Sequence, residues 1–406
     1  MAEPLLSPLR VIELSAFIAA PYAGLLLAQH GADVIRVDPI GGGPDIQRWP
    51  LAADGTSLYW AGLNKRKRSV AVDTRSPRGR ELVAALITRE DAAGGVVLTN
   101  LAARGELAHE RLVASRPDLI ALYLKGQYDN QTAVDYTVNS AVGVPFATGE
   151  ATPDRPINNM LPAWDALAGA QAALALGLAH ARRQRSGLGD RIDLALGDVA
   201  YAFVSHIGIT AEAELYGRER PACGNHVYGS LGRDLATADG RRLMFACVTT
   251  NQWRAMVAAT GTAEAITALE RALGLDFNAE SARWESRELL VAMFEQWTRR
   301  RPLDEIRPIF DQHGVCWGPY QSFRQLVDED PRFTDANPLI ATIEQPGIGR
   351  IRVAGLPATF ASRTDRGIGP GPRLGQHTEE VLTSLLGLST AQFGRLADDG
   401  IVRQHP

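Results

Sequence analysis

Short apolar runs alternate with longer helical segments through the first 125 residues of the chain. The apolar runs predict buried strands, and the segments between them predict helices. The strands are predicted at 9–14, 32–37, 69–72, 95–99 and 119–124, and the helices at 21–30 and 77–89. This alternation is typical of an α/β, Rossmann-like fold in which helices cover both faces of a doubly wound parallel sheet. In such open sheets the ligand lies beyond the carboxyl ends of the strands, so we expect the functional residues there.

The residue composition of the chain changes after residue 216, where a polar linker that contains glycine begins. Before it, the pattern predicts a long Ala- and Leu-rich helix at 165–185, a strand at 191–196 and a helix at 198–216. After it, Asp239-Gly240 predicts a hairpin, and further helices are expected at 251–259, 279–299 and 303–313. We therefore predict a large domain over 1–216, a linker and a small α+β domain over 217–330, and a C-terminal part over 331–406 that returns to the large domain.

The charge balance of the 406 residues is slightly acidic, with a formal net charge of −4. Such a chain has no overall field that attracts nucleic acid or an anionic membrane, so neither partner is expected. The three cysteines are far apart and form no CxxC, which indicates neither a disulfide framework nor a zinc site. The sequence shows no signal peptide and no membrane span, and we therefore expect a cytoplasmic protein.

Three common motifs for cofactors, metals and nucleophiles are missing. The turn after strand 9–14 reads SAFIAAPYAG and lacks the GxGxxG glycines that let a backbone approach a pyrophosphate. Asp38 stands where a ribose-binding acid would be, but alone it is a weak signal for NAD or FAD. The eight histidines form no HExxH, and no GxSxG occurs. Neither a metal site nor a hydrolase nucleophile is expected.

Four adjacent cations, Lys65 to Arg68, precede the strand at 69–72. One interpretation is a solvated basic loop, which is the usual meaning of a charge run. The other is a phosphate anchor, because ammonium and guanidinium groups bind phosphates through charge-assisted hydrogen bonds. Arg36 and Arg104 lie beside other predicted strand ends and are candidates to join such an anchor.

Asp165 directly precedes the long Ala-rich helix, in the segment LPAWD. An aspartate there is a good N-cap, which is the structural interpretation. The chemical interpretation is compatible with it, because a carboxylate at a helix N-terminus is kept ionised by the helix dipole. Such a carboxylate is an oriented nucleophile for an acyl group, and nearby amides could stabilise a developing oxyanion.

Several segments together resemble the family III CoA-transferases. The opening VIELSAFIAAPYAGLLLAQHGADVIRVD is similar to the N-terminal signature of that family, and NKRKRSVAVD to its N-x-x-K-R-S segment. LTNLAARG resembles its E-N-F-x-P-G segment, although the Pro-Gly pair is replaced here. PRLGQHTEEVL resembles the C-terminal signature. The resemblance covers essentially the whole chain.

The resemblance implies roles for individual residues. Asp165 takes the position of the catalytic aspartate of the family, and Lys67 that of the lysine in N-x-x-K-R-S. Together with the basic-run interpretation, CoA contacts are expected from Phe17, Ala19, Arg36, Lys67, Asn100, Leu101 and Arg104. Substrate contacts are expected from Ile18, Asp135 and Tyr136. The family also implies an interlocked homodimer.

Finer likenesses point to one activity within the family. Several short segments resemble the branch that interconverts the two regioisomers of mesaconyl-CoA. They are SAFIAAP, RVDPIGGG, RWP with YWAGLNK, DYTVN, LPAWD and EQPGIG. In the racemase branch a histidine precedes the aspartate that matches Asp135, whereas this chain has Val134. Without that imidazole, proton abstraction lacks one of its two bases, so racemase chemistry is disfavoured. Ile18 replaces a glutamine of oxalate-binding members, and its apolar side chain suits a methyl-bearing acyl group.

The resemblance therefore implies intramolecular CoA transfer between the two carboxylates of a dicarboxylic acid, through an aspartyl-CoA thioester at Asp165. No separate cofactor is expected, because CoA enters and leaves as part of the substrate. One alternative is intermolecular transfer from a dicarboxylic acyl-CoA to a free acid. Another, from a different class, is a CoA-binding protein without catalytic activity.

Overall fold

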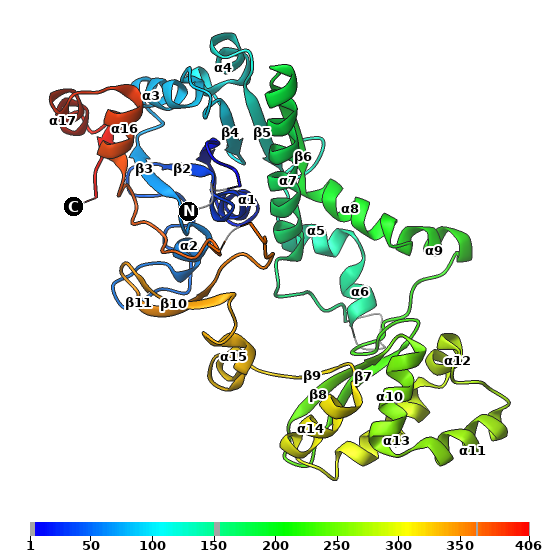
Figure 1. Cartoon of the computed structure of the whole chain (residues 1–406). Coiled ribbons are helices and arrows are strands. Elements are labelled where there is room, and N and C mark those ends of the chain that lie inside the picture. Colours follow the sequence, from blue (N-terminus) through cyan, green and yellow to red (C-terminus); the bar gives the residue numbers. More distant parts are fainter. Residues whose placement is uncertain (1–4, 150–154, 363, 406) are drawn as a thin grey trace. The chain divides into compact units, whose positions relative to one another are not determined.

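The computed structural model of the chain describes residues 5–149, 155–362 and 364–405 (Figure 1). The chain divides into two compact units. The first comprises Met1–Val142, Asn159–Glu212 and Pro331–Pro406, and the second comprises Gly143–Asn158 and Ala213–Asp330. The larger segment of the second unit begins at Ala213, close to the boundary expected after residue 216, and the tail after residue 330 belongs to the first unit. Residues 143–158, which the sequence assigned to the large domain, belong to the second unit.

The first unit is built on a seven-stranded sheet with the order β12-β3-β2-β1-β4-β5-β6. Its strands are β1 (Arg10–Leu14), β2 (Asp33–Asp38), β3 (Arg68–Val72), β4 (Val96–Thr99), β5 (Ile120–Lys125), β6 (Asp190–Ala195) and β12 (Val402–Arg403). Every neighbouring pair is parallel except β12 with β3. The α/β fold with a mainly parallel sheet is therefore confirmed. The strand order reverses between β1 and β4, and ligands of open sheets bind at such a switch point.

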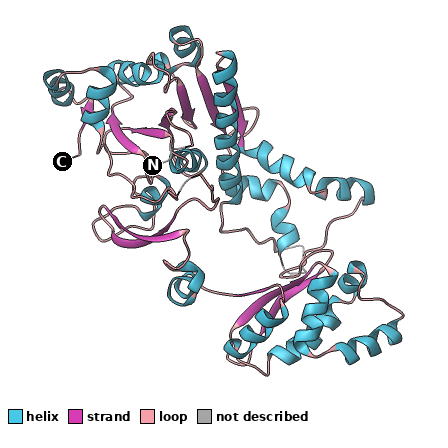
Figure 2. Ribbon diagram, in the orientation of Figure 1, coloured by secondary structure: helices cyan, strands magenta, loops and turns pink. Residues whose placement is uncertain are grey.

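Helices cover the sheet on both faces (Figure 2). One face shares a hydrophobic core with residues of three helices, among them Val83, Leu86, Val381 and Leu396. These helices are α3 (Pro77–Thr88), α16 (Thr378–Leu386) and α17 (Thr390–Asp398). The C-terminal segment thus packs on the sheet that the N-terminal strands form.

The helices α1 (Ala19–Gln29) and α7 (Ala163–Ser186) pack closely against each other near the other face. Gly169 makes this approach possible, because a Cβ atom there would lie 2.6 Å from the carbonyl oxygen of Ala19. Small residues let helix backbones approach, so the Ala- and Gly-rich sequence of α7 has a packing role. This contact brings the start of α7 beside the turn that follows β1.

The remaining elements of the first unit are shorter. They are α2 (Leu58–Leu63), η1 (Gly105–Leu107), α4 (His109–Ser115), α5 (Asp135–Ala141), α8 (Leu196–His206), η2 (Pro331–Phe333) and the hairpin of β10 (Ile340–Gln345) with β11 (Gly349–Ala354). The helix α9 (Ile209–Tyr216) contains the boundary between the two units in the sequence. The single helix predicted at 198–216 is wrong in one respect. It is interrupted between α8 and α9, where Gly208 adopts a φ of 80°.

The second unit is an antiparallel sheet of β7 (Leu231–Ala236), β8 (Arg242–Cys247) and β9 (Trp317–Pro319), packed with helices. Its helices are α6 (Val144–Thr148), α10 (Thr250–Thr260), α11 (Ala263–Leu273), α12 (Glu280–Glu285), α13 (Arg287–Thr298), α14 (Leu303–His313) and α15 (Phe323–Glu329). The core includes Phe245, Phe294 and Phe310. The helix predicted at 279–299 is two helices that meet at Ser286. Among the described residues, no helix is both long and apolar enough to cross a bilayer.

Candidate active site

Asp165 is the third residue of α7 and is half-buried. The expectation that it caps this helix is wrong, because Pro162 holds the N-cap position and makes no side-chain hydrogen bond. The free amides are satisfied instead by Asp135, whose Oδ2 accepts hydrogen bonds from the backbone N–H groups of Trp164 at 2.7 Å and of Asp165 at 3.0 Å. Within the described part of the chain, no hydrogen bond or ion pair engages the Asp165 carboxylate. It is therefore available for chemistry.

Asp135 itself is a buried residue at the start of α5. Because its carboxylate bonds two amides of the first turn of α7, it acts as a cap supplied from another helix. A second bond ties the same two helices, since Trp164 Nε1 donates to Asn139 Oδ1 at 3.0 Å. Asp135 thus has a helix-capping role through Oδ2, and the substrate contact expected of it stays a prediction. The neighbouring Tyr136 is exposed.

The pKa of the Asp165 carboxyl is raised to about 7. Burial is the main cause, the negative charge of Asp135 adds to it, and the positive charge of Arg48 opposes both. The expectation that the helix dipole keeps this group fully ionised is therefore revised, because desolvation and the second carboxylate outweigh the dipole here. At neutral pH the group is divided between an ionised nucleophile and a protonated acid.

The guanidinium of Arg48 lies within electrostatic reach of this carboxylate and over two aromatic rings. The Cζ of Arg48 lies 4.9 Å from the ring centroid of Tyr59 and 5.8 Å from that of Phe17. Burial raises the pKa of Tyr59, and the charges of Asp165 and Arg48 act on it in opposite directions. The Tyr59 hydroxyl is buried without a hydrogen-bond partner in the part of the chain that is described. The sequence reasoning singled out RWP and YWAGLNK as unusual segments but assigned no role to Arg48 or Tyr59.

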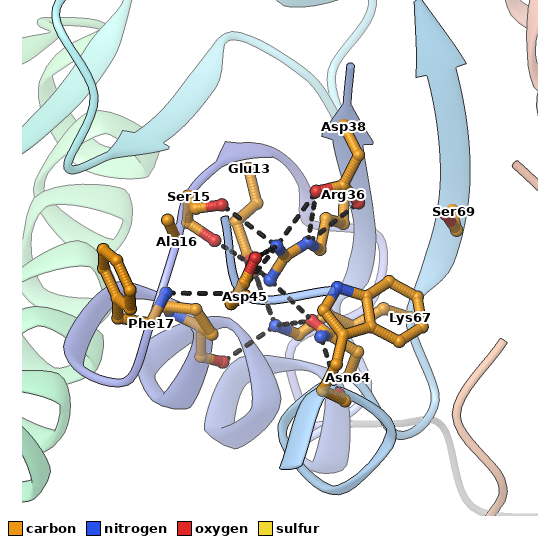
Figure 3. Close-up of polar contacts among 12 residues, drawn as sticks. Glu13, Ser15, Ala16, Phe17, Arg36, Asp38, Asp45, Asn64, Lys67 and Ser69 are labelled. Atoms are coloured by element: carbon orange, nitrogen blue, oxygen red, sulfur yellow. Dashed lines mark hydrogen bonds and ion pairs between the residues drawn. The ribbon is translucent and has the colours of Figure 1, made fainter. Parts of the chain in front are cut away.

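The turn after β1 is held in an uncommon conformation. Asn100 forms two hydrogen bonds with Ala16, accepting from its N–H at 2.9 Å and donating to its carbonyl oxygen at 2.8 Å. The N–H of Phe17 donates to Asp45 Oδ2 at 3.1 Å (Figure 3), and Phe17 has a φ of 67°. A left-handed conformation at an aromatic residue persists only where the surroundings enforce it, and such residues cluster at functional sites. Asn100, predicted to contact CoA, thus also shapes the turn.

Arg36 and Lys67 lie in a buried network under this turn rather than in an exposed anchor (Figure 3). The Arg36 guanidinium donates to Asp38 and Asp45, and the Lys67 ammonium donates to Glu13 and to the carbonyl oxygen of Pro21. Burial lowers the pKa of Lys67 to about 8, although the Glu13 carboxylate opposes this effect. Because both cations are buried and paired, the phosphate contacts predicted for them are not compatible with this arrangement. They hold the turn instead.

The basic run is dispersed in the same way. Arg66 pairs with Asp365, and Arg68 pairs with Asp33 and Glu380. Lys65 is half-buried, and burial lowers its pKa. Arg66, Lys67 and Arg68 therefore point to different partners, which fits neither a solvated basic loop nor a phosphate anchor formed by the whole run.

A groove of about 700 Å³ lies beyond the carboxyl ends of β4 and β5. Asn100 and Leu101 line it, as do polar and charged residues that include His109, Lys125, Gln131 and Arg191. Arg104 is exposed in the next segment of the chain. The groove is at the edge of the sheet where a nucleotide-like ligand is expected, and Asn100 connects it to the turn at Phe17.

The other predicted contacts lie at the start of α1. Ile18 is the half-buried N-cap residue, and Ala19 is buried against α7. Of the predicted residues, the structure thus gathers Phe17, Ile18 and Ala19 at the turn beside the start of α7, and Asn100 with Leu101 at the groove. Arg36 and Lys67 lie beneath the turn.

Comparison with known proteins decides the family. A model of CoA-transferase family III matches residues 6–378 of the chain. The chain belongs to CoA-transferase family III. As a member of this family it is an enzyme, and the residues gathered at the start of α7 are its candidate active site.

Individual relatives match nearly the whole length of this CoA-transferase. It is 46% identical over 399 residues to "2-methylfumaryl-CoA isomerase" of Chloroflexus aurantiacus, with 98% of each chain covered. It is 30% identical to "Succinyl-CoA--D-citramalate CoA-transferase" of the same organism, with 96% of each chain covered. Among solved structures, a CAIB/BAIF family protein from Brucella suis matches with a TM-score of 0.76 and 26% identity, covering 95% of this chain and 100% of that one.

Proposed function

We propose that this enzyme interconverts the two regioisomers of 2-methylfumaryl-CoA (mesaconyl-CoA) by moving CoA between the carboxylates at carbon 1 and carbon 4. The 46% identity to 2-methylfumaryl-CoA isomerase over 98% of the chain supports this substrate. The observation that carries the chemistry is the unengaged carboxylate of Asp165 in the first turn of α7. A carboxylate that makes no hydrogen bond or ion pair with its neighbours is free to attack an acyl group.

In the proposed reaction, the Asp165 carboxylate attacks the thioester carbonyl of the substrate. The carbon–sulfur bond breaks, and the products are a mixed anhydride and CoA thiolate. The thiolate then attacks the aspartyl carbonyl of the anhydride, so that mesaconate leaves as a carboxylate and an aspartyl-CoA thioester remains. Mesaconate next attacks this thioester through its other carboxylate, which again gives an anhydride and thiolate. Attack of the thiolate on the mesaconyl carbonyl releases the isomeric product and restores Asp165.

The geometry of the substrate explains why a protein carboxylate takes part. The two carboxyl groups of mesaconate lie trans across a double bond, so they cannot form an internal anhydride. The CoA must therefore be held on the protein while the diacid reverses its orientation in the site. Every bond made or broken involves only the thioester, the diacid and Asp165, so the proposed reaction uses no separate cofactor. The groove beside Asn100 and Leu101 is the proposed binding site of the CoA moiety.

Replacement of the nucleophile tests the proposal. Asp165→Ala should lower turnover by at least about 10³-fold, since the covalent step is lost, and circular dichroism should show an intact fold. Hydroxylamine added during turnover of the wild type should modify Asp165 alone. Turnover of Asp165→Ala near the wild-type rate would exclude the mechanism.

Intermolecular transfer is the second candidate, because a relative with 30% identity is named a succinyl-CoA–D-citramalate CoA-transferase. Isotope-labelled free mesaconate distinguishes the two reactions. Intramolecular transfer should convert one regioisomer to the other with little label in the product. Incorporation of the label at the rate of isomerisation would favour the intermolecular reaction.

We further propose a cytoplasmic homodimer. Free thiols at Cys223, Cys247 and Cys316 suit a reducing compartment. Large apolar side chains such as Leu174 and Leu178 on α7 and Ile207 after α8 are exposed in the single chain, and a second copy would cover such a surface. Light scattering after gel filtration should give twice the mass of one chain.

A further inference from the structure

Arg48 is a cation without an ionic partner beside the candidate nucleophile. It lies in the loop between β2 and α2 and is half-buried. Within the described residues, no ion pair or side-chain hydrogen bond engages its guanidinium, which lies over the rings of Phe17 and Tyr59. Arg36, Arg66 and Arg68 of the same unit all have carboxylate partners. A half-buried guanidinium that lacks an anion is suited to bind one from outside the chain.

The position of Arg48 indicates which anion this is. Its charge acts on both Asp165 and Tyr59, so it lies within electrostatic reach of the nucleophile, although no ion pair joins it to Asp165. The phosphates of CoA are separated from the thioester by the whole pantetheine arm. A cation near the attacking carboxylate therefore faces the acyl end of the substrate and not its nucleotide end.

We propose that Arg48 binds the free carboxylate of the dicarboxylic acyl group while the other carboxyl is joined to CoA or to Asp165. The inference rests on the proposed function and adds a specificity residue to it. The guanidinium offers a planar pair of donors that matches a carboxylate. The rings of Phe17 and Tyr59 hold its plane before the substrate arrives, which reduces the entropy lost on binding.

The same contact has a use in both halves of the proposed reaction. Whichever carboxyl of mesaconate reacts, the other is a free carboxylate that Arg48 can hold. After the aspartyl-CoA thioester forms, mesaconate is a dianion with no covalent link to the enzyme, and a charge-assisted contact delays its escape. Arg48 thus selects dicarboxylic thioesters and keeps the released diacid in the site.

The test compares two thioesters that differ at one group. Tiglyl-CoA has the carbon skeleton of 2-methylfumaryl-CoA with a methyl group in place of the free carboxylate. The rate of aspartyl-CoA formation is measured by mass spectrometry with both thioesters. The wild type should favour 2-methylfumaryl-CoA by about 100-fold, the effect of one desolvated charge pair. In Arg48→Met this preference should fall to less than about fivefold, because the rate with 2-methylfumaryl-CoA falls much further than the rate with tiglyl-CoA. Loss of the Arg48 charge also raises the pKa of Asp165, which slows both reactions alike and leaves their ratio unchanged. Arg48→Lys should be intermediate.

Control variants and a binding measurement separate the possible failures. Arg254→Gln, at an exposed position of α10, should keep the full preference. Equal losses with both thioesters in Arg48→Met, or a preference that survives, would overturn the proposal. If Arg48→Met does not fold, the wild type alone tests the proposal, and equal wild-type rates with the two thioesters would overturn it.

Equilibrium binding to the inactive Asp165→Asn variant distinguishes this inference from the proposed function. Tighter binding of 2-methylfumaryl-CoA than of tiglyl-CoA, lost when Arg48→Met is added, supports the role of Arg48 even if no adduct forms on Asp165. Equal binding of the two thioesters refutes it while leaving the proposed reaction intact.

Discussion

The ionised carboxylate of Asp165 lowers the stability of the fold, and Asp165→Asn should reveal by how much. Burial and the charge of Asp135 raise its pKa from an ordinary value of 3.8 to about 7. An increase of this size corresponds to at most about 4 kcal/mol at pH 8, and solvent screening of the half-buried group reduces it to about 2 kcal/mol. Because the folded-state pKa is the higher one, the folded protein favours the protonated form. The stability that this proton contributes is present below the unfolded pKa and is lost as the pH rises through 7.

Asparagine carries no charge at any pH and avoids this loss. Urea unfolding followed by far-UV circular dichroism should show Asp165→Asn about 2 kcal/mol more stable than the wild type at pH 8, and less than about 1 kcal/mol more stable at pH 5. Its turnover should be lost. Glu214→Gln, on the exposed surface of α9, should show no comparable difference. An Asp165→Asn variant that is no more stable than the wild type at pH 8, or equally stabilised at both pH values, would refute the reasoning.

Three further predictions concern the same region. The kcat/KM of the wild type should rise with pH with a midpoint near 7, as Asp165 ionises; a flat profile between pH 5.5 and 8.5 would contradict this. Asp135→Ala should cost about 1–2 kcal/mol in urea unfolding through loss of the α7 cap, and Asp135→Asn, which keeps an acceptor, should cost less. Gly24→Ala should destabilise by about 1–3 kcal/mol, because its Cβ would lie 1.7 Å from Glu13 Oε2, whereas Gly62→Ala meets nothing within 4 Å and should be tolerated.

The strands of the parallel sheet were predicted to within one or two residues. A strand buried on both faces is a continuous apolar run, and this signal is local. The short helices α2, α5 and α6 were missed, because a helix of five to seven residues is too short to show a period. The break between α8 and α9 depends on the left-handed conformation of Gly208, which a smooth helical pattern hides.

The candidate site divides in the same way. Asp165 was proposed from its place before a long helix and from the resemblance to a family. The cap that frees it was not, because Asp135 lies 30 residues earlier in the chain. A sequence also does not distinguish a paired cation from a free one. Lys67 and Arg36 looked like ligands for phosphate but are neutralised by buried carboxylates, whereas Arg48 was overlooked.

The amino-acid sequence by itself indicated the strands of the parallel sheet and singled out Asp165 as the candidate nucleophile, since the first follows from residues close together in the chain and the second from the resemblance to a family. Only the tertiary structure decided which charges are neutralised, which cation faces Asp165 and where the pKa of that group lies. Desolvation and Coulomb energies depend on distances between groups in space. Those distances are set by how α1, α5, α7 and the turn after β1 pack, and no local pattern contains them.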